Sequence, residues 1–441
     1  MTGSPRLSKR VPGPGGARLP AVLPRLLPGV LPRLLPAGFA AGPADLTGHL
    51  ARYGPPPRPG LDWRQRESLI AEVSRAGLTG RGGAGFPTAC KLAAVAAGPS
   101  PAVIANGTEG EPASAKDKVL MARSPHLVLD GAVLAAELTG AGEAVIVVHR
   151  SVREILDEAV AERRRARHDQ IRIKVVTAAG RFVAGEASAV VHWIERGIPL
   201  PTARPPRLSE RGLANNPTLV QNVETLAHLA LIARYGASWF RSVGTPAEPG
   251  SMLVTVLGAV REPRVLEIAI GTPLGQVLEL AGGASAPLRA LLLGGYFGDW
   301  VDATAAMSRP FSSAGLADFG AGPGAGLIAA LPADACGLRE TARVARYLAG
   351  ESAGQCGPCR FGLAAVADQI ERLAQGRTAD PGLLRRWLGQ VGDRGGCAHP
   401  GGVVRLVRSA LRTFGAELDE HAVGWCCGTA SVLPVPPETA R

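Results

Sequence analysis

The stretch Ala102-Val103-Ile104-Ala105-Asn106-Gly107-Thr108-Glu109-Gly110-Glu111-Pro112 joins a short apolar run to a polar turn. The apolar run has the length and composition of a buried strand. One amide and two carboxylates follow it directly, and ligands of α/β proteins gather at the carboxyl ends of strands. These carboxylates can accept hydrogen bonds from ribityl, ribose or amide groups. A polar turn that satisfies its own backbone accounts for the same residues, so both interpretations stay open.

Outward from this stretch, strand-like and helix-like segments alternate. Residues 127–138 have a helical pattern, whereas residues 144–148 and 171–176 read as further strands. Alternation of this kind predicts an α/β layered domain, which we place at residues 45–245.

Two further units follow in the chain. Residues 246–333 contain two alternating strand runs, a helix and another strand, which predicts a small β-grasp-like domain. Residues 334–420 contain helical patterns separated by glycine-rich breaks, which predicts a helical bundle with its motifs in the breaks. Residues 1–44, where proline recurs every fourth position over part of the length, are expected to form a flexible lead-in, and residues 421–441 a C-terminal tail.

A glycine-rich loop precedes the first apolar run. Within residues 77–88, Gly80, Gly82 and Gly85 fit the pattern G-x-G-x-x-G. Glycines at this density let backbone amides approach a ligand, and the following helix would add a partial positive charge suited to phosphate. The segment before the loop looks helical, not like the strand that a dinucleotide-binding fold requires, and a glycine-rich surface turn accounts for it as well.

Residues 351–360, Glu351-Ser352-Ala353-Gly354-Gln355-Cys356-Gly357-Pro358-Cys359-Arg360, contain a C-x-x-C pair, and Cys397 adds a third cysteine further on. Iron–sulfur, zinc and redox disulfide chemistry all use such pairs. A thioredoxin-like disulfide would need a βαβ setting, and zinc would favour a second close pair. We interpret Cys426 and Cys427 as structural or incidental. Cys90 and Cys336 are expected to be small buried apolar residues.

Composition limits the class of protein. The chain has 441 residues, 46% of them hydrophobic, a formal charge of +11 and seven cysteines. An odd cysteine count in so long a chain argues against a secreted disulfide framework, so we expect a reducing, cytoplasmic location. The arginine run at residues 163–167 lacks interleaved aromatics and is interpreted as a solvated helix face, not a nucleic-acid site. No segment is expected to span a membrane.

Taken together, these segments resemble the NADH-binding FMN and iron–sulfur flavoprotein component of respiratory complex I, which is the 51 kDa family or F subunit of NADH-quinone oxidoreductase. The resemblance covers residues 45–414. It depends on residues 80–88, 106–112, 125–126, 185–186, 217–218, 222–225 and 351–360.

The resemblance implies an FMN-binding α/β domain, a β-grasp domain of the soluble-ligand-binding (SLBB) type and a helical domain with one [4Fe-4S] cluster. It implies an oxidoreductase that takes hydride from NADH onto FMN and passes single electrons through the cluster to a ferredoxin or ferredoxin-like subunit, with membrane association only through partners. No protein residue is catalytic, because the flavin carries the chemistry. The residues that it assigns to FMN or NADH are Gly80, Arg81, Gly82, Gly83, Lys91, Asn106, Glu109, Glu111, Gly185, Glu186, Gln221, Asn222 and Thr225. Those that it assigns to the cluster are Cys356, Cys359 and Cys397.

The chain departs from the family pattern at four positions, which makes it a divergent member. Ala353 replaces a cluster cysteine, Thr108 an aspartate, Ala187 a glutamate that helps place the dinucleotide, and Gln221 the first of two asparagines. A missing thiolate leaves three outcomes open: a [3Fe-4S] cluster, a [4Fe-4S] cluster with His399 or a C-terminal cysteine as fourth ligand, or no cluster. The alternative function is an electron-transfer module that exchanges electrons with a ferredoxin or membrane partner and does not oxidise NADH.

Overall fold

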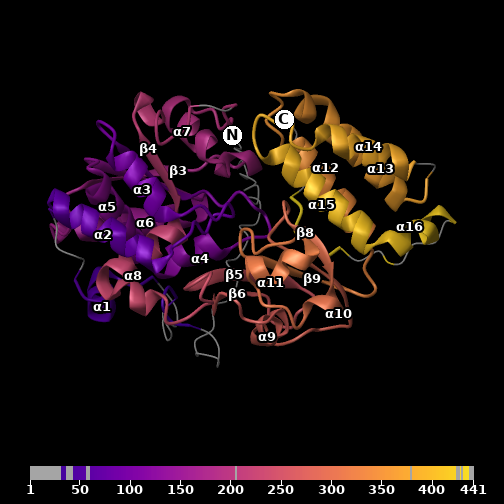
Figure 1. The fold of residues 1–441 in the computed structure, drawn as a ribbon, viewed down its shortest axis with the longest axis horizontal. Helices are drawn as coiled ribbons and strands as arrows, with labels where there is room; N and C mark the ends of the chain where they lie inside the picture. The colour runs from indigo at the N-terminus through magenta and orange to yellow at the C-terminus, as the bar shows by residue number, and fades with distance from the viewer. Residues whose placement is uncertain are drawn as a thin grey trace, which may run out of the picture.

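The protein is described by a computed structural model that covers residues 31–35, 43–55, 60–203, 206–377, 380–423, 428 and 431–436. Three units follow one another along the chain, an α/β unit, a smaller sheet unit and a helical unit (Figure 1). The predicted mixed α/β class with a β-grasp-like unit and C-terminal helices is confirmed.

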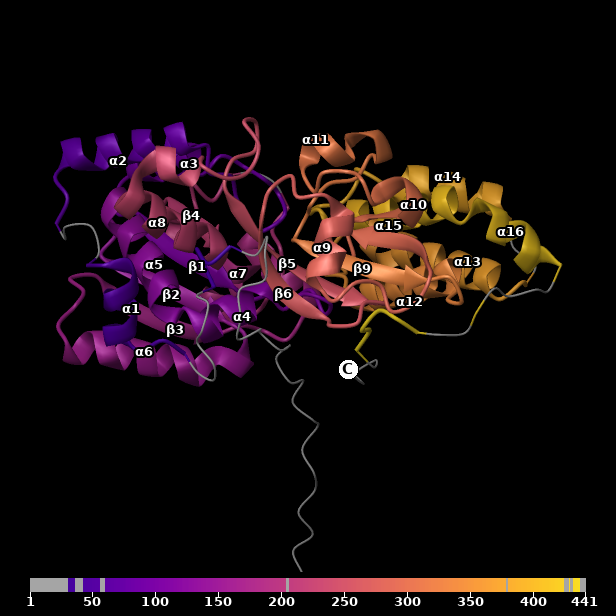
Figure 2. The same cartoon turned by 90° about the horizontal axis from the view of Figure 1, so that it is seen from below.

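The sheet of the α/β unit is entirely parallel. Its strands, in spatial order, are β3 (Arg172–Thr177), β2 (Glu143–Val148), β1 (Ala102–Gly107) and β4 (Thr218–Asn222). Figure 2 shows the strands stacked in this order, from β4 near α3 to β3 near α6. Strands β2 and β3 lie on one side of β1 in the sheet, and β4 lies on the other side. The boundary between β1 and β4 is therefore the switch point, where open α/β sheets bind ligands.

Helix α5 (Pro125–Thr139) forms the centre of this unit, because every one of its residues is buried. It packs against α8 (Val223–Phe240), and Gly131 permits the close approach: a Cβ there would lie 2.0 Å from the Leu226 carbonyl oxygen. The remaining helices are α1 (Leu46–Tyr53), α2 (Trp63–Ala76), α3 (Thr88–Ala96), α4 (Lys116–Arg123), α6 (Arg153–Arg165) and α7 (Ala187–Arg196).

The second unit is a five-stranded mixed sheet. Its spatial order is β6 (Arg264–Ala269), β5 (Ser251–Gly258), β9 (Leu327–Pro332), β7 (Leu288–Leu293) and β8 (Asp299–Asp302). Strands β5 and β9 run parallel, and the other pairs are antiparallel. Helix α9 (Leu274–Leu280) packs its apolar residues into the core of this sheet, and two short helices, α10 (Ala303–Ala306) and α11 (Ser313–Leu316), follow β8.

The helical unit contains α12 (Gly337–Gly350), α13 (Leu363–Ala374), α14 (Pro381–Val391), α15 (His399–Thr413) and α16 (Gly415–Ala422). All five lie in the C-terminal part of the chain, where the sequence predicts a helical bundle. Their buried leucines, valines and alanines form one core together with residues of β7 and β9, so the helical unit and the sheet unit share apolar contacts.

The structure corrects three sequence-based expectations. Arg163 is buried, not solvated, and Cys90 is exposed, not buried. Within the proline-rich segment, residues 31–35 are packed: the backbone N–H groups of Leu34 and Leu35 both donate to the buried carboxylate of Glu267 on β6. Residues 1–30 lie outside the described part of the chain.

None of the described helices is by itself long and apolar enough to cross a membrane; α4 and α5 pass that test only as a pair bent by 97°.

Candidate functional site

Polar side chains from β1 and β4 meet at the switch point of the parallel sheet. The register pairs Asn106 with Asn222 and Ala105 with Gln221. The Asn106 amide donates to the carbonyl oxygen of Gly185 at 2.9 Å, which attaches the loop before α7 to the same edge. Pairing of neighbouring parallel strands therefore brings together four of the predicted positions that lie far apart in the sequence.

The glycine-rich loop lies over this edge. The Arg81 backbone N–H donates to Thr225 Oγ1 at 2.8 Å, and a Cβ on Gly82 would lie 3.3 Å from Asn222 Cβ. Lys91, on the helix that follows the loop, points Nζ toward Gln221 Oε1 at 3.4 Å. Burial lowers the pKa of the Arg81 guanidinium. A glycine-rich loop thus covers the strand ends, with one cation in the loop and a second on the helix that follows it.

Glu111 is half-buried, with one buried carboxylate oxygen unused. Its Oε2 accepts from the Tyr296 backbone N–H at 2.9 Å, but Oε1 has no hydrogen-bond partner among the described residues, and neither has Oγ1 of buried Thr108. Burial raises the pKa of Glu111 to about 7. Gly295 has φ +103°, and a Cβ there would lie 2.9 Å from Glu111 Oε2. Unused buried polar atoms beside a glycine cradle fit a polar ligand such as FMN or a dinucleotide, because such atoms are costly without a partner.

A buried ionic network supports the strand ends from below. Lys116 Nζ lies 2.8 Å from Asp117 Oδ1 and 2.7 Å from Glu224 Oε2. The Asn222 amide donates to Asp117 Oδ2 at 2.7 Å. Burial raises the pKa of Asp117 to about 6, while the two carboxylates outweigh burial and raise the pKa of Lys116. Sequence reasoning did not assign these three residues, although they stand inside or beside the quoted motifs.

Glu109 and Glu186 have their carboxylates engaged within the protein. Glu109 accepts from the backbone N–H groups of Asp117 and Lys118 at the start of α4, at 3.0 and 2.9 Å. Glu186 is the N-cap of α7 and accepts from the N–H groups of Ser188 and Ala189. Both are helix caps here. Their assignment to cofactor binding stays a prediction, as does the assignment of the other site residues.

The three predicted cluster cysteines converge on one place between α12 and α15. Backbone N–H groups of Gly396, Gly354 and His399 hydrogen-bond to the sulfurs of Cys356, Cys359 and Cys397, respectively. Burial raises the pKa of Cys359 to about 12 and also raises the pKa of Cys397, whereas N–H donors outweigh burial and lower the pKa of Cys356. Backbone donors of this kind stabilise thiolates and cluster sulfurs.

The candidates for a fourth cluster ligand have different surroundings. His399 Nε2 donates to the Leu348 carbonyl oxygen at 2.8 Å, which leaves Nδ1 as a buried acceptor that has no partner among the described residues. Burial lowers the pKa of His399 to about 4. Ala353 is half-buried in the loop before the C-x-x-C pair. Cys426 and Cys427 lie outside the described residues.

The loop between β3 and α7 contacts both places. The Phe182 backbone N–H donates to Glu351 Oε2 at 2.8 Å, and Arg181 Nη2 donates to the Ser352 carbonyl oxygen at 3.1 Å. Gly110, in the polar turn after β1, is close to the same loop, since a Cβ there would lie 2.8 Å from the Phe182 carbonyl oxygen. The segment that attaches to Asn106 therefore also holds the loop that carries the cluster cysteines.

Family models match the three units separately. The Nuo51 FMN-binding domain matches residues 73–231, the SLBB domain residues 253–298, and the NADH-ubiquinone oxidoreductase-F iron-sulfur binding region residues 339–421. An F subunit of NADH-quinone oxidoreductase from Rhizobium meliloti, the copy numbered 1, is 32% identical over 384 residues, which cover 82% of this chain and 87% of the relative. The chain belongs to the family of NADH-quinone oxidoreductase F subunits. The F subunit of Streptomyces coelicolor is 30% identical and is covered to 84% of its length.

A solved structure agrees with this assignment. The NAD+-reducing [NiFe]-hydrogenase in its H2-reduced state matches with a TM-score of 0.75 and 32% identity over 81% of this chain, which spans 62% of that hydrogenase chain. As a member of the family, the chain has an FMN-binding domain and an iron–sulfur binding region, and it is a flavoprotein of the NADH dehydrogenase class. The predicted family, cofactor set and enzyme class are confirmed. The predicted domain boundaries stay predictions.

Proposed function

We propose that this protein oxidises NADH with FMN bound at the β1–β4 switch point and passes electrons through an iron–sulfur cluster on Cys356, Cys359 and Cys397 to an iron–sulfur protein. The observation that carries the proposal is the loop of residues 181–186, which is hydrogen-bonded to Asn106 on one side and to the cluster loop on the other. A flavin at the sheet edge and a cluster at those cysteines would be neighbours across this loop.

The protein's part in the reaction is to bind and orient two ligands. Bound FMN accepts hydride and releases electrons one at a time. Gly82 and Gly83 would expose backbone N–H groups to the phosphate end of FMN, and Arg81 and Lys91 would supply positive charge. The Gly80 N–H donates to the Phe86 carbonyl oxygen at 2.9 Å, so Gly80 would shape the loop. The amides that converge at the sheet edge would hold the flavin ring and ribityl group. These are Asn106, Gln221 and Asn222, with Thr225 and Gly185 beside them.

Glu111 would serve the dinucleotide. Its unused Oε1 and its raised pKa, about 7, give a group that can donate or accept near neutral pH. Tyr296 and Gly295 hold it from the β-grasp unit, so the wall of the site comes from two units. Such a group can hydrogen-bond to the ribose or carboxamide of NADH.

The cluster would have three cysteine ligands. Ala353 stands at the position of the missing thiolate, so a [3Fe-4S] cluster needs nothing more. A [4Fe-4S] cluster needs one further ligand, and the unpartnered Nδ1 of His399 is the described atom with the right chemistry.

The partner would be a ferredoxin or ferredoxin-like subunit. The charge of +11 favours an acidic partner. We place the protein in the cytoplasm, with membrane contact only through such partners.

The test is an anaerobic titration of the purified, cofactor-loaded chain. NADH should bleach the flavin band and support reduction of an artificial electron acceptor. In Asn222→Ala, which removes a side chain from the sheet edge, flavin content should fall, while the exposed variant Arg165→Ala should behave like the parent. Bleaching by reduced ferredoxin but not by NADH would instead establish the electron-transfer module without NADH oxidation.

The cluster is tested separately by low-temperature EPR. A three-iron signal in the isolated protein should convert to a four-iron signal in Ala353→Cys. If Cys359→Ser leaves the iron content unchanged, the cysteine assignment is wrong.

A further inference from the structure

A second group of metal-ligating side chains lies in the helical unit, apart from the cluster cysteines. The ligand atoms of Cys336, Glu417 and His421 are within 4.8 Å of one another, and all three residues are buried. The distance from Cys336 Sγ to His421 Nε2 is 3.5 Å, and that from the same sulfur to Glu417 Oε2 is 3.8 Å. Sequence reasoning treated Cys336 as a small apolar residue, and the structure places it among polar groups instead.

Two helix ends create this juxtaposition. Cys336 is the N-cap of α12, and its sulfur accepts from the Arg339 backbone N–H at 3.4 Å, a setting that favours a thiolate. Glu417 and His421 are four residues apart on α16 and therefore share one face of that helix. Gly337 lets the two helices approach, since a Cβ there would lie 2.3 Å from the Phe414 ring just before α16.

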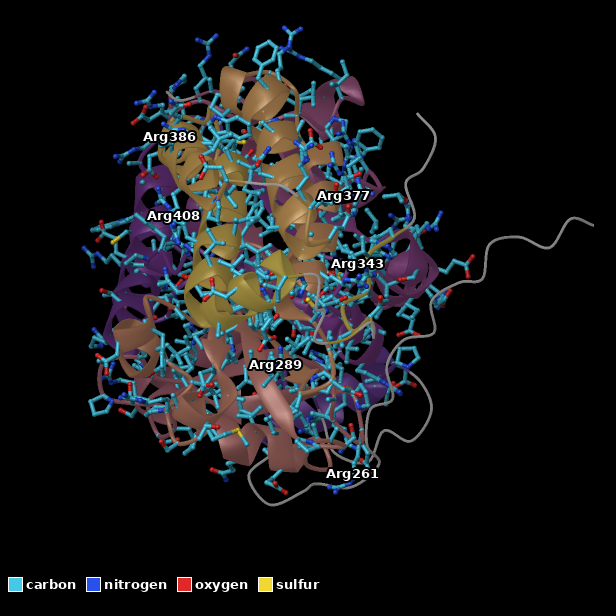
Figure 3. The ribbon with its side chains drawn as sticks, turned by 90° about the vertical axis from the view of Figure 1, so that its right-hand side faces the viewer. Arg261, Arg289, Arg343, Arg377, Arg386 and Arg408 are labelled. Carbon is cyan, nitrogen blue, oxygen red and sulfur yellow. The ribbon has the colours of Figure 1, made fainter. Side chains whose placement is uncertain are left out.

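The charges are arranged for a cation between them. Glu417 Oε1 is paired with Arg289 of β7, so Oε2 faces the Cys336 sulfur. Figure 3 shows Arg289 where the helical unit meets the sheet unit. Arg289 thus orients the Glu417 carboxylate through the oxygen that does not face the sulfur. Residues that hydrogen-bond to metal ligands commonly orient them in this way.

The spacing suits a tetrahedral zinc ion. With Zn–S near 2.3 Å and Zn–N near 2.0–2.1 Å, two tetrahedral ligands lie about 3.5–3.6 Å apart. The observed 3.5 Å between sulfur and imidazole nitrogen agrees with this value, and the 3.8 Å to the carboxylate oxygen is slightly longer. A thiolate excludes calcium and magnesium as natural occupants.

We propose that Cys336, Glu417 and His421 bind Zn²⁺, with a fourth ligand from outside this triad. The ion joins α16 to the start of α12. It is separate from the iron–sulfur site, which lies beyond the other end of α12: the 14 residues of that helix span about 21 Å. The role of the ion is structural, because it ties the last described helix to the shared core of the helical and sheet units.

The experiment measures zinc and iron together in the cluster-loaded full chain, purified anaerobically, incubated with zinc sulfate and freed of excess metal. We expect one zinc per chain, and at least a tenfold loss of zinc in Cys336→Ser and in His421→Asn with iron and FMN unchanged. Cys90→Ser, at an exposed thiol, is the matched control and should keep its zinc.

Cluster cysteines can themselves take up zinc, so Cys359→Ser is the decisive comparison. Zinc that is lost in Cys359→Ser but kept in Cys336→Ser would overturn the proposal, and so would a parent protein that binds no zinc.

X-ray absorption at the zinc edge of the unmodified protein answers the same question if the variants do not fold. One sulfur with nitrogen and oxygen neighbours supports the triad. A shell of three sulfurs assigns the zinc to the cluster cysteines and overturns the proposal.

Discussion

Helix α8 contributes to two buried ionic networks, and they differ in how their charges are arranged. Near its N-terminus, Glu224 pairs with Lys116 below the sheet edge. Ten residues on, or about 15 Å along the axis, Arg234 pairs with Asp130 of α5. The first network places one lysine between two carboxylates, whereas the second places one carboxylate between two arginines.

The Asp130 network places one buried carboxylate among several cationic or hydrogen-bonding groups. Asp130 accepts from His49 at 2.7 Å and pairs with Arg163 at 2.8 Å, and Arg163 is also held by Asp169 at 2.6 Å. Burial alone would raise the pKa of Asp130, but His49 and Arg163 hold this pKa well below its usual range. At the sheet edge the opposite holds, because burial raises the pKa values of Glu111 and Asp117. A carboxylate that cations hold in its ionised form is typical of a structural cluster, and raised carboxyl pKa values are typical of a binding site.

The largest effect is expected from removing the Asp130 carboxylate. Asp130→Ala should lower the free energy of unfolding by about 3–5 kcal/mol, because buried Arg234 loses its counter-charge and buried Arg163 keeps only Asp169. Urea denaturation measures the loss. The affinity of the folded protein for FMN should stay at the parental value, and a loss of FMN affinity comparable to that of a sheet-edge variant would mean that the two networks are not independent.

The next effect concerns pH. Glu111 binds its proton more tightly in the folded state, with a pKa of about 7 against an ordinary value of 4.5. Its contribution to stability is therefore fully present below pH 4.5 and is lost as the pH rises through 7. As the pH rises from 4.5 through 7, the free energy of unfolding of Glu111→Gln should therefore increase relative to that of the parent by up to about 3 kcal/mol.

The free energies of unfolding of the flavin-free parent and of flavin-free Glu111→Gln are measured across this pH range. Contributions from other titrating groups cancel in the difference between the two proteins. A difference that is flat with pH would show that Glu111 is ionised in the folded protein and would remove the contrast with Asp130.

A smaller effect is expected at the support of the sheet edge. Asp117→Asn keeps the size of the side chain but loses the charge that faces Lys116 and one acceptor for Asn222. FMN affinity should fall about tenfold, the equivalent of one hydrogen bond near 1.4 kcal/mol. Fluorescence titration of the flavin measures it. Asp157→Asn, at an exposed ion pair on α6, is the control and should bind FMN as the parent does.

The smallest effect tests the arginine run itself. Arg165→Ala, two residues after buried Arg163 on the same helix, removes an exposed side chain that pairs only with exposed Glu158 among the described residues. Its Tm should stay within about 1 °C of the parent in a thermal melt. A shift comparable to that of Asp130→Ala would mean that the whole run is structural.

Periodicity predicted most of the fold, because long apolar segments commit to one element. The α5 and β1 segments are examples, because both are apolar along most of their length and both are largely buried in the structure. Periodicity could not reveal that β4 pairs with β1, because strand order depends on contacts between residues more than a hundred positions apart. It also missed the burial of Arg163, since a charge run looks solvated until Asp130 and Asp169 are seen to surround one of its members.

At the candidate site, motif resemblance named residues that do come together. It could not distinguish a residue that binds a cofactor from one that caps the N-terminus of a helix. Glu109 and Glu186 stand in quoted motifs and yet satisfy helix N-termini. Lys116 was missed because its role depends on ion pairs with two carboxylates, one of which is more than a hundred residues away. Cys336 stood alone in the sequence, and only the packing of α16 gives it neighbours.

The hydrogen bonds from Arg181 and Phe182 to the cluster loop set an order of assembly. The residues that they join are separated by about 170 positions, so these contacts of the cluster loop form only when the α/β unit has folded. Chains fold from the N-terminus during synthesis, and that unit is complete first. Destabilising the α/β unit is therefore expected to loosen the cluster loop as well, so that variants of that unit lose iron together with flavin.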